Sequence, residues 1–149
     1  MNKLDEAIIL ATQAHAGQLD KGGAPYILHP LRVMMAMTTE QERIVAVLHD
    51  VIEDSDYTLA DIASQFGDDA ADDVEALTRR SDETYEAFIR RCSCNPRVCR
   101  VKLADVIDNM DLSRLGREPT SHDIERRARY ERAYAELRSA SRAHGGGEG

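Results

Sequence analysis

The sequence lacks both the long apolar segments of a membrane protein and the leader of an exported one. It contains no run of about 18 apolar residues, the length that a transmembrane helix requires. Its first six residues, Met-Asn-Lys-Leu-Asp-Glu, include acidic side chains and form no apolar segment, unlike a signal peptide. We therefore expect a cytoplasmic protein with no membrane association.

Cysteine is scarce, and its distribution does not indicate disulfide bonds. The chain has three cysteines, Cys92, Cys94 and Cys99, and an odd number in an unexported chain argues against a disulfide framework. Their spacing does not match the usual zinc knuckles, which leaves zinc binding as the less favoured alternative. The preferred interpretation is that they are reduced, partly buried thiols on helices.

The chain also lacks an excess of basic residues. Its 19 lysine and arginine residues are outnumbered by 27 aspartate and glutamate residues, for a formal net charge of −8. Such a charge repels nucleic acid polymers and anionic lipids over long range. A small polyanionic substrate is still compatible with this charge, provided that a metal ion or a few basic side chains neutralise it locally.

The composition is that of one folded domain. The chain has 149 residues, of which 42% are hydrophobic and 31% charged, so it can bury a core. It shows neither an internal repeat nor a linker, and we expect a single domain over residues 1–143. The glycine-rich end, residues 144–149, is expected to be a flexible tail.

The hydrophobic pattern is helical almost throughout. Apolar residues recur at helical spacing, whereas strict alternation is nearly absent. Gly17 and Gly67 end two of the segments, while Thr58 (with Asp61) and Asn95 are start signals. We predict an all-α, compact single-domain bundle of about seven to eight helices. The expected helices cover residues 3–16, from about 29, 40–52, 58–67, 69–79, 83–93, 95–115 and 120–142.

One segment concentrates residues that bind metals or transfer protons. His49-Asp50-Val51-Ile52-Glu53-Asp54 closes an apolar helical stretch, Ile44-Val45-Ala46-Val47-Leu48. Acidic residues at a helix C-terminus face the negative end of the helix dipole, so a cation should offset them. Taken alone, the segment is compatible with either a divalent metal ion or a solvated acidic helix end.

Two distant segments favour the metal. His29 follows a loop rich in glycine and proline, between apolar residues, and Asp105 interrupts an apolar stretch of a later helix. A carboxylate in such a stretch is costly unless it is paired or bound to metal. His29, His49, Asp50 and Asp105 together would offer mixed nitrogen and oxygen ligands, which suit manganese, iron or zinc better than calcium. Asn109 lies one turn after Asp105 on the same face.

These residues resemble the metal-binding pattern of the HD superfamily, in which a distant histidine, an adjacent His-Asp pair and a final aspartate occur in this order. Within that superfamily the chain is similar to the hydrolase half of RelA/SpoT-type enzymes. The similar segments are AHAGQLDKGGAPYILHPLRV at residues 14–33, AVLHDVIEDS at 46–55 and VKLADVIDNMDLSRL at 101–115. The resemblance covers residues 7–115 and continues more weakly through the last helix.

The resemblance implies a role for each matching residue. The metal, usually manganese in this family, would be bound by His29, His49, Asp50 and Asp105. The acidic pair Glu53 and Asp54 would handle water and protons near the scissile phosphate.

It also implies a substrate site. Lys21 would contact the nucleotide from its loop, and Asn109 would contact the ribose. Arg126 and Tyr130 resemble a basic and aromatic pair that closes the pocket, although a surface arginine and a packing tyrosine are an equal alternative.

The activity implied is metal-dependent removal of the 3′-pyrophosphate from guanosine alarmones, converting (p)ppGpp to GDP or GTP. We expect a hydrolase without synthetase activity, acting on a small nucleotide; the sequence does not indicate an oligomeric state. Alternatives are hydrolysis of (p)ppApp or of the 2′-phosphate of NADPH, a non-catalytic alarmone-binding module, and a purely structural helical protein.

The chain departs from the family pattern at two places. Bifunctional relatives commonly read Arg-Leu-His-Asn after the final aspartate, where this chain reads Val106-Ile107-Asp108-Asn109. The residue before Lys21 is often arginine and here is Asp20. Both changes remove positive charge near the expected base or phosphates, which leaves the base and the number of phosphates open.

A few polar residues outside this pattern have less definite interpretations. His15 suits the end of the first helix, because a histidine there complements the helix dipole; a direct catalytic role is the less favoured alternative. Lys102 either reaches a phosphate or extends its amine to solvent. Arg32 and Arg114 are expected on the surface.

Overall fold

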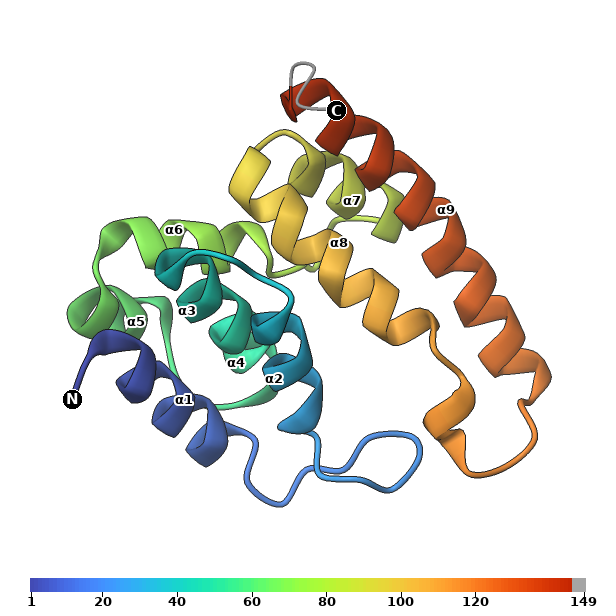
Figure 1. The fold of residues 1–149 in the computed structure, drawn as a ribbon, viewed down its shortest axis with the longest axis horizontal. Helices are drawn as coiled ribbons and strands as arrows, with labels where there is room; N and C mark the ends of the chain where they lie inside the picture. Colours follow the sequence, from blue (N-terminus) through green and yellow to red (C-terminus); the bar gives the residue numbers. More distant parts are fainter. Residues whose placement is uncertain (146–149) are drawn as a thin grey trace.

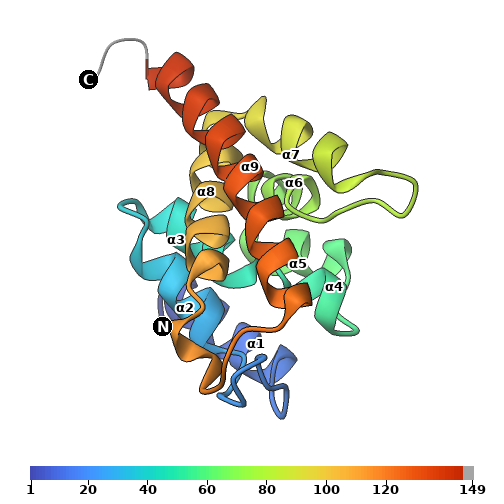
Figure 2. The same ribbon diagram turned by 90° about the vertical axis from the view of Figure 1, so that its right-hand side faces the viewer.

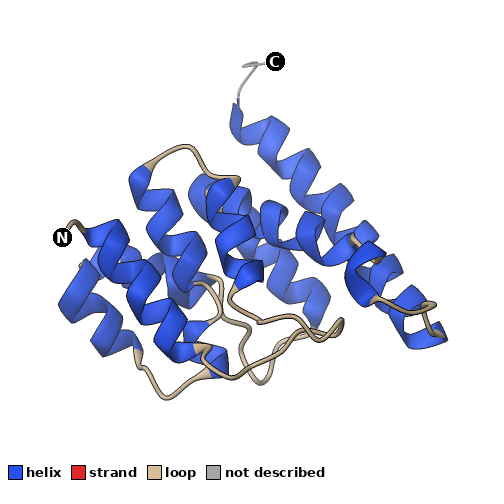
Figure 3. Ribbon diagram, turned by 60° about the horizontal axis from the view of Figure 1, so that its bottom comes forward, coloured by secondary structure: helices blue, strands red, loops and turns tan. Residues whose placement is uncertain are grey.

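The computed structural model describes residues 1–145 and shows an all-helical fold, as predicted (Figures 1 and 3). No strand occurs in these residues, and one isolated bridge joins Leu19 to Pro25 within a loop. Nine α-helices and one 3-10 helix follow each other along the described chain: α1 (Lys3–Ala14), α2 (Leu28–Met35), α3 (Glu40–Leu48), α4 (Val51–Asp54), α5 (Leu59–Phe66), α6 (Asp68–Ala76), α7 (Tyr85–Ser93), α8 (Pro96–Met110), η1 (Ser113–Leu115) and α9 (Ser121–Gly145).

Helix α3 lies at the centre of the bundle. It packs against α1, α2, α6 and α8 (Figure 1). Its residues Ile44–Leu48 are all buried, because this stretch is apolar on every side and only a central helix can bury it. The long helix α9 crosses the outer side of α8 and α7 (Figure 2). Residues at the end of α3 are therefore held rigidly within the core.

The predicted start signals form the expected caps. Thr58 accepts a hydrogen bond from the Asp61 backbone, and the Asp61 carboxylate accepts one from the Thr58 backbone, which completes a capping box for α5. Asn95 caps α8 with its side chain, and Pro96 follows at the first helical position.

Three helix boundaries differ from the prediction. The expected helix over residues 40–52 breaks at His49 and Asp50 into α3 and the single turn α4. Helix α8 ends at Met110 rather than near 115, and η1 follows it. Helix α9 includes His144 and Gly145, which we had assigned to the flexible tail; the remaining tail residues, 146–149, lie outside the described part of the chain.

The three cysteines are free thiols. Cys92 and Cys99 are buried and Cys94 is exposed, and the Cys92 thiol donates to the Ala76 carbonyl. Burial raises the pKa of Cys92 to about 12, so it stays protonated at neutral pH. None of the helices in residues 1–145 combines the length and apolar character needed to cross a membrane.

Candidate active site

The break between α3 and α4 positions the central His-Asp pair. The His49 ring donates from Nδ1 to the Ala46 carbonyl at 2.6 Å, and the His49 backbone N–H approaches the same carbonyl at 3.4 Å. A side chain that binds a helix carbonyl in this way competes with the regular helical hydrogen bond. The chain turns here, and Asp50 is the N-cap residue of α4.

Four side chains from α2, α8 and this break meet inside the bundle. His29, His49 and Asp105 each place one potential ligand atom within 4.8 Å of the other two, and all three are buried. Asp50 lies beside this group, with Oδ2 at 3.1 Å from His49 Nε2 and 3.7 Å from His29 Nε2. The structure thus brings together the four residues that the sequence selected as candidate ligands.

The chemistry of the His49 ring fits a cation at this point. Its Nδ1 carries the proton donated to Ala46, while Nε2 is buried and has no hydrogen-bond partner within residues 1–145. That nitrogen instead faces Asp50 and, at 3.4 Å, Asp105 Oδ1. A neutral imidazole would oppose its lone pair to two carboxylates, so either a proton or a metal ion must lie between them.

Electrostatics within the group are strongly perturbed. Burial opposes the charged form of His29, but its hydrogen bonds with Asp105 and Asp108 outweigh burial and raise its pKa to about 9. Burial likewise opposes charge on His49, yet Asp50 and Asp105 raise its pKa well above the usual value. For Asp50, the neighbouring His49 overcomes the effect of burial and lowers the pKa to about 2. This concentration of negative charge favours protons or a metal ion.

Asp105 is fixed by its own helix. Lys102, one turn earlier on α8, forms an ion pair with Asp105 Oδ2 at 2.7 Å, and Asn109 donates to Oδ1 at 3.1 Å. Oδ1 is also 2.8 Å from His29 Nε2. Lys102 is buried, so neither of its predicted roles, phosphate contact or extension to solvent, describes it.

Tyr26 is a site residue that the sequence analysis did not select. Its hydroxyl donates to Asp50 Oδ2 at 2.5 Å, and its ring lies between those of His15 and His29, with centroid distances of 5.0 and 5.7 Å. Burial, followed by the charge of Asp50, raises the pKa of Tyr26 above its usual value. Tyr26 therefore remains a hydrogen-bond donor to Asp50.

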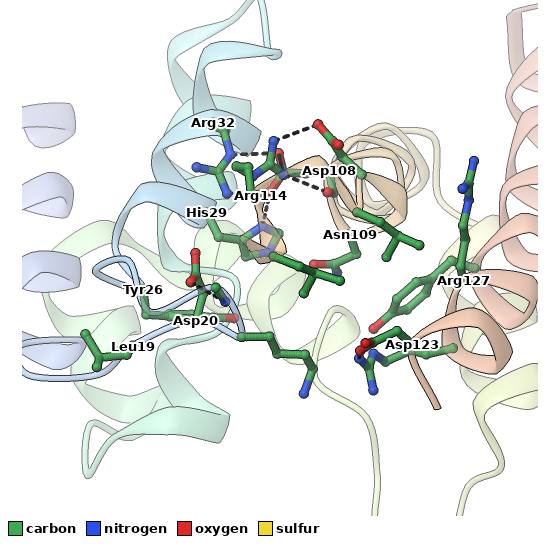
Figure 4. Close-up of a pocket in the computed structure, with 17 residues that line it drawn as sticks. Leu19, Asp20, Tyr26, His29, Arg32, Asp108, Asn109, Arg114, Asp123 and Arg127 are labelled. Carbon is green, nitrogen blue, oxygen red and sulfur yellow. Dashed lines mark hydrogen bonds and ion pairs between the residues drawn. The ribbon is translucent and has the colours of Figure 1, made fainter. Parts of the chain in front are cut away.

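Asp108 is a second residue that the sequence did not identify as part of the site. Its Oδ2 lies 2.6 Å from His29 Nδ1, the nitrogen opposite Asp105. Arg32 and Arg114, both expected on the surface, donate to the same carboxylate at 2.7 and 3.1 Å (Figure 4). The spacing of three residues after Asp105 was the available signal, since it places both side chains on neighbouring parts of one helix face.

The predicted catalytic pair Glu53 and Asp54 lies on α4. Glu53 is exposed, and its Oε1 accepts a hydrogen bond from the Arg79 backbone at 2.9 Å. Desolvation and the neighbouring Asp50 raise the pKa of Asp54. Gln18 donates to the Asp54 carbonyl at 2.8 Å, which ties α4 to the end of α1. Both residues are exposed: the Glu53 carboxylate is held by the Arg79 backbone, and the charge of Asp50 acts on the Asp54 carboxyl.

A cavity of about 320 Å³ opens beside the buried group. Its walls come from the loop after α1, from α2, from the end of α8 with η1, and from the start of α9 (Figure 4). It is lined by Leu19, Asp20, Lys21, Gly22, Tyr26, His29, Arg32, Asp108, Asn109, Asp111, Leu112, Arg114, Leu115, Asp123, Arg126, Arg127 and Tyr130. All four predicted substrate-binding residues, Lys21, Asn109, Arg126 and Tyr130, are on this wall.

The loop that carries Lys21 is shaped by Asp20. The Asp20 carboxylate accepts hydrogen bonds from the backbones of Gly22 and Ala24, both at 2.9 Å. An added Cβ at Gly22 would collide with the carbonyl oxygen of Arg114, so this glycine lets the loop approach η1 closely. Asp20, where the resemblance predicts arginine, therefore builds the turn that presents Lys21.

Helix α9 forms the opposite wall. Arg126 pairs with Asp123 at 2.6 Å, and the Tyr130 ring packs 6.3 Å from that of Tyr85. Both residues face the cavity, as the substrate-binding interpretation predicts. Both also have partners within the fold, as the alternative of a surface arginine and a packing tyrosine predicts. Asp123 accepts from the Thr120 backbone as well, which anchors the start of α9.

His15 is the C-cap residue of α1, as expected, and it is buried. Its Nδ1 is 2.9 Å from Gln18 Oε1, and Nε2 has no hydrogen-bond partner among the described residues. Its ring packs against that of Tyr26 and so supports the site from below. Within residues 1–145, His15 makes no hydrogen bond to the four clustered side chains.

Comparison with protein families gives a match over most of the chain. The HD domain family profile matches residues 7–143. A similar solved structure is that of a metazoan ortholog of SpoT that hydrolyses ppGpp and plays a role in starvation responses. It shares 28% sequence identity and a TM-score of 0.77, over 95% of this chain and 86% of that one.

Curated relatives are much longer proteins. A probable GTP pyrophosphokinase of Mycobacterium leprae is 35% identical over 123 residues, 72% of this chain and 15% of that protein. A guanosine-3′,5′-bis(diphosphate) 3′-pyrophosphohydrolase of Aquifex aeolicus is 34% identical over 120 residues, 72% of this chain and 17% of that protein. The chain thus spans less than a fifth of the length of these relatives.

Proposed function

The chain belongs to the HD domain family, and from this membership and its site we propose that it is a metal-dependent phosphohydrolase of guanosine alarmones. The reaction would convert (p)ppGpp to GDP or GTP and pyrophosphate. The observation that carries the proposal is the buried group of His29, His49 and Asp105, with Asp50 beside it; His29 also lines a cavity. That cavity, of about 320 Å³, is within the range of small-ligand sites.

The residues that would hold the metal are His29, His49, Asp50 and Asp105. Two carboxylates balance a divalent charge, and two imidazoles favour a transition metal; we propose Mn²⁺. When bound, such an ion neutralises phosphoryl charge and lowers the pKa of water. The buried Nε2 of His49, which has no hydrogen-bond partner in residues 1–145, is the feature that best supports the assignment.

The chain's own side chains would complete the reaction. Water attacks the phosphorus attached to the ribose 3′ oxygen, and that phosphorus–oxygen bond breaks. We assign Asp54 to accept the proton of the attacking water, because it lies one turn after Asp50, whose carbonyl accepts from the Asp54 backbone at 3.0 Å. Its raised pKa also suits a general base that must return a proton. The 3′ oxygen leaves with a proton, and the water oxygen stays on pyrophosphate. Glu53, on the same turn of helix α4, would assist this proton transfer without accepting the proton itself.

Substrate binding would use the cavity wall. Lys21 is the cation on this wall that has no ion-pair partner within residues 1–145, whereas Arg32, Arg114, Arg126 and Arg127 are each paired with a carboxylate. We assign Lys21 to the nucleotide phosphates and Asn109 to the ribose. Arg126 and Tyr130 would cover the base.

The relatives support this proposal at two levels. The metazoan structure is that of a ppGpp hydrolase and aligns with nearly the whole chain. The Aquifex protein is named as the corresponding 3′-pyrophosphohydrolase, although this chain matches only a part of it.

A nucleotide panel tests the proposal. Purified protein with Mn²⁺ would be incubated with ppGpp, pppGpp, ppApp and NADPH, and phosphorus NMR would distinguish pyrophosphate from single phosphate. We expect metal-dependent release of pyrophosphate from ppGpp, abolished in His49→Gln and retained in His122→Gln, a control on the exposed start of α9.

The other outcomes identify the alternatives. Faster cleavage of ppApp, or release of single phosphate from NADPH, would replace the guanosine alarmone as substrate while keeping the hydrolase class. Tight nucleotide binding without cleavage would favour a binding module. Absence of both metal and nucleotide binding would leave a structural protein.

A further inference from the structure

Both ring nitrogens of His29 are held by carboxylates from α8. Nε2 lies 2.8 Å from Asp105 Oδ1, inside the proposed metal group, and Nδ1 lies 2.6 Å from Asp108 Oδ2, outside it. His29 is only 5% exposed, so water does not substitute for either partner. The rotation of this ring is therefore set from both sides by two carboxylates one helical turn apart.

Asp108 is itself held firmly. Arg32 donates to both carboxylate oxygens at 2.7 and 3.1 Å, in the two-point geometry that guanidinium groups favour. Arg114 donates to Asp108 Oδ1 at 3.1 Å and to its backbone carbonyl at 2.9 Å. The carboxylate side chain is 13% exposed. Two arginines thus keep Asp108 charged and fixed against the His29 ring.

We infer that Asp108 is a positioning residue that prepares His29 to bind the metal. By accepting the Nδ1 proton, it leaves the Nε2 lone pair facing the metal group. A histidine ligand is generally oriented by such a carboxylate, which also makes the imidazole a better donor. The inference rests on the metal centre proposed above, and Asp108 lies at the position where this sequence departs from the family pattern.

The competing explanation is a purely structural role, in which Asp108 only holds the cavity wall together. Asp108 also ties Arg32 on α2 to Arg114 on η1, so its loss would loosen the cavity wall whether or not it orients His29. Asp111 separates the two roles. It pairs with the same Arg114 guanidinium at 2.9 Å, on an exposed edge, and has no hydrogen bond to His29 within residues 1–145.

Metal affinity is the first measurement. Isothermal titration with Mn²⁺ needs no nucleotide, so its result stands even if the proposed substrate is wrong. We expect Asp108→Ala to weaken binding about 10- to 100-fold, as loss of an outer carboxylate partner typically does. Asp108→Asn keeps an acceptor oxygen and should lose less, while Asp111→Ala should stay within about twofold of the unsubstituted protein.

Nitrogen NMR of the zinc-loaded protein is the second measurement, since Zn²⁺ is diamagnetic. The unsubstituted protein should show protected Nδ1–H signals from both ligand histidines. His49 donates its Nδ1 proton to Ala46 and serves as an internal reference. Asp108→Ala should remove the His29 signal alone. If this variant does not fold, Asp108→Asn should shift the same signal, because a neutral acceptor binds the proton more weakly.

Three results would overturn the inference. They are Mn²⁺ affinity unchanged in the folded Asp108 variants, a His29 Nδ1–H signal that is absent from the zinc-loaded protein, and an equal loss of affinity in Asp111→Ala. Failure of the unsubstituted protein to bind any divalent metal would overturn the metal centre as well. Metal binding without nucleotide cleavage would contradict only the proposed activity.

Discussion

The hydroxyl of Tyr26 donates to Asp50 Oδ2 at 2.5 Å and thereby connects the glycine-rich loop to the helix break 24 residues later. The acceptor is the oxygen that faces both imidazoles. Without this donor, Asp50 would be freer to rotate, and its oxygen would be less often in place for a metal ion.

We predict that Tyr26→Phe weakens Mn²⁺ binding roughly tenfold, at the lower end of the effect of an outer hydrogen-bond partner. The ring and its packing between His15 and His29 remain, so the melting temperature of chelator-treated protein should change little. Titration calorimetry measures the affinity. Tyr57→Phe is the matched control, since its hydroxyl donates to Gln13 at 3.4 Å in an exposed position. Equal losses in both variants would contradict the prediction.

The acidic pair on α4 should divide into one proton acceptor and one supporting residue. Asp54→Asn is expected to lower kcat roughly 100- to 10,000-fold, because it removes the carboxylate whose pKa is raised beside Asp50. Glu53→Gln should lower it less than about tenfold, because the Glu53 carboxylate accepts from the Arg79 backbone. Single-turnover rates of pyrophosphate release, at saturating Mn²⁺, make the comparison. A greater loss in Glu53→Gln would reverse the assignment.

The pH dependence of stability should change sign when metal is added. A pKa of His29 raised to about 9 adds stability that is complete below the unfolded value of about 6.5 and is lost as pH rises through 9. For His29 alone, this pKa shift corresponds to roughly 3 kcal/mol in the free energy of unfolding between the two ends of that pH range. With Mn²⁺, binding requires neutral imidazoles, so stabilisation by metal should instead increase over the same pH range.

Urea unfolding at several pH values between 6 and 9, with chelator and with Mn²⁺, measures both slopes. His29→Gln should flatten the slope in chelator, and His122→Gln should leave it unchanged. Slopes of the same sign under both conditions would mean that protons and metal do not compete for this group.

Local sequence signals predicted most helices and the four clustered side chains. Capping at Thr58 and Asn95 depends on residues within three positions, so it is visible in the sequence. The break after Leu48 was missed because apolar residues resume at Val51 and Ile52, directly after His49 and Asp50. What interrupts the helix is the bond from the His49 ring to the Ala46 carbonyl, and periodicity carries no information about ring orientation.

The supporting residues of the site could not be found in the same way. The partners of Tyr26 and Asp108 lie 24 and 79 residues away, and only the packing of α2 on α8 brings the latter pair together. Arg32 was assigned to the surface because an isolated arginine usually lies there. Its partner follows it by 76 residues. Asp20 forms a turn in its own loop. The sequence analysis considered only the charge that Asp20 has in place of the expected arginine, so it did not predict this turn.

Lys21 should contribute to substrate binding more than to chemistry. We predict that Lys21→Gln raises KM for ppGpp about tenfold with kcat nearly unchanged, as expected when a contact made equally in the ground and transition states is lost. Steady-state kinetics in low salt measure both constants. Lys3→Gln, at the start of α1 and outside the cavity lining, is the control and should change neither. A fall in kcat at constant KM would place Lys21 in the chemical step.

Lys102 should be essential for the stability of the folded chain. It is buried, and its ion pair with Asp105 compensates a carboxylate that is itself 3% exposed. Loss of Lys102 removes the cation that binds Asp105 Oδ2, and removing one member of a buried pair typically costs about 3–5 kcal/mol. We therefore expect Lys102→Met to lower the free energy of unfolding by that amount in chelator, as measured by urea denaturation.

Added Mn²⁺ should restore part of this loss, because a cation beside Asp105 Oδ1 compensates the same carboxylate from its other side. Arg80→Met is the control: its pair with Glu75 is exposed, with 55% and 42% of the two side chains accessible, and its loss should cost less than about 1 kcal/mol. Equal destabilisation of Lys102→Met with and without Mn²⁺ would show that the ion does not reach Asp105, and the metal centre would then have to be placed elsewhere.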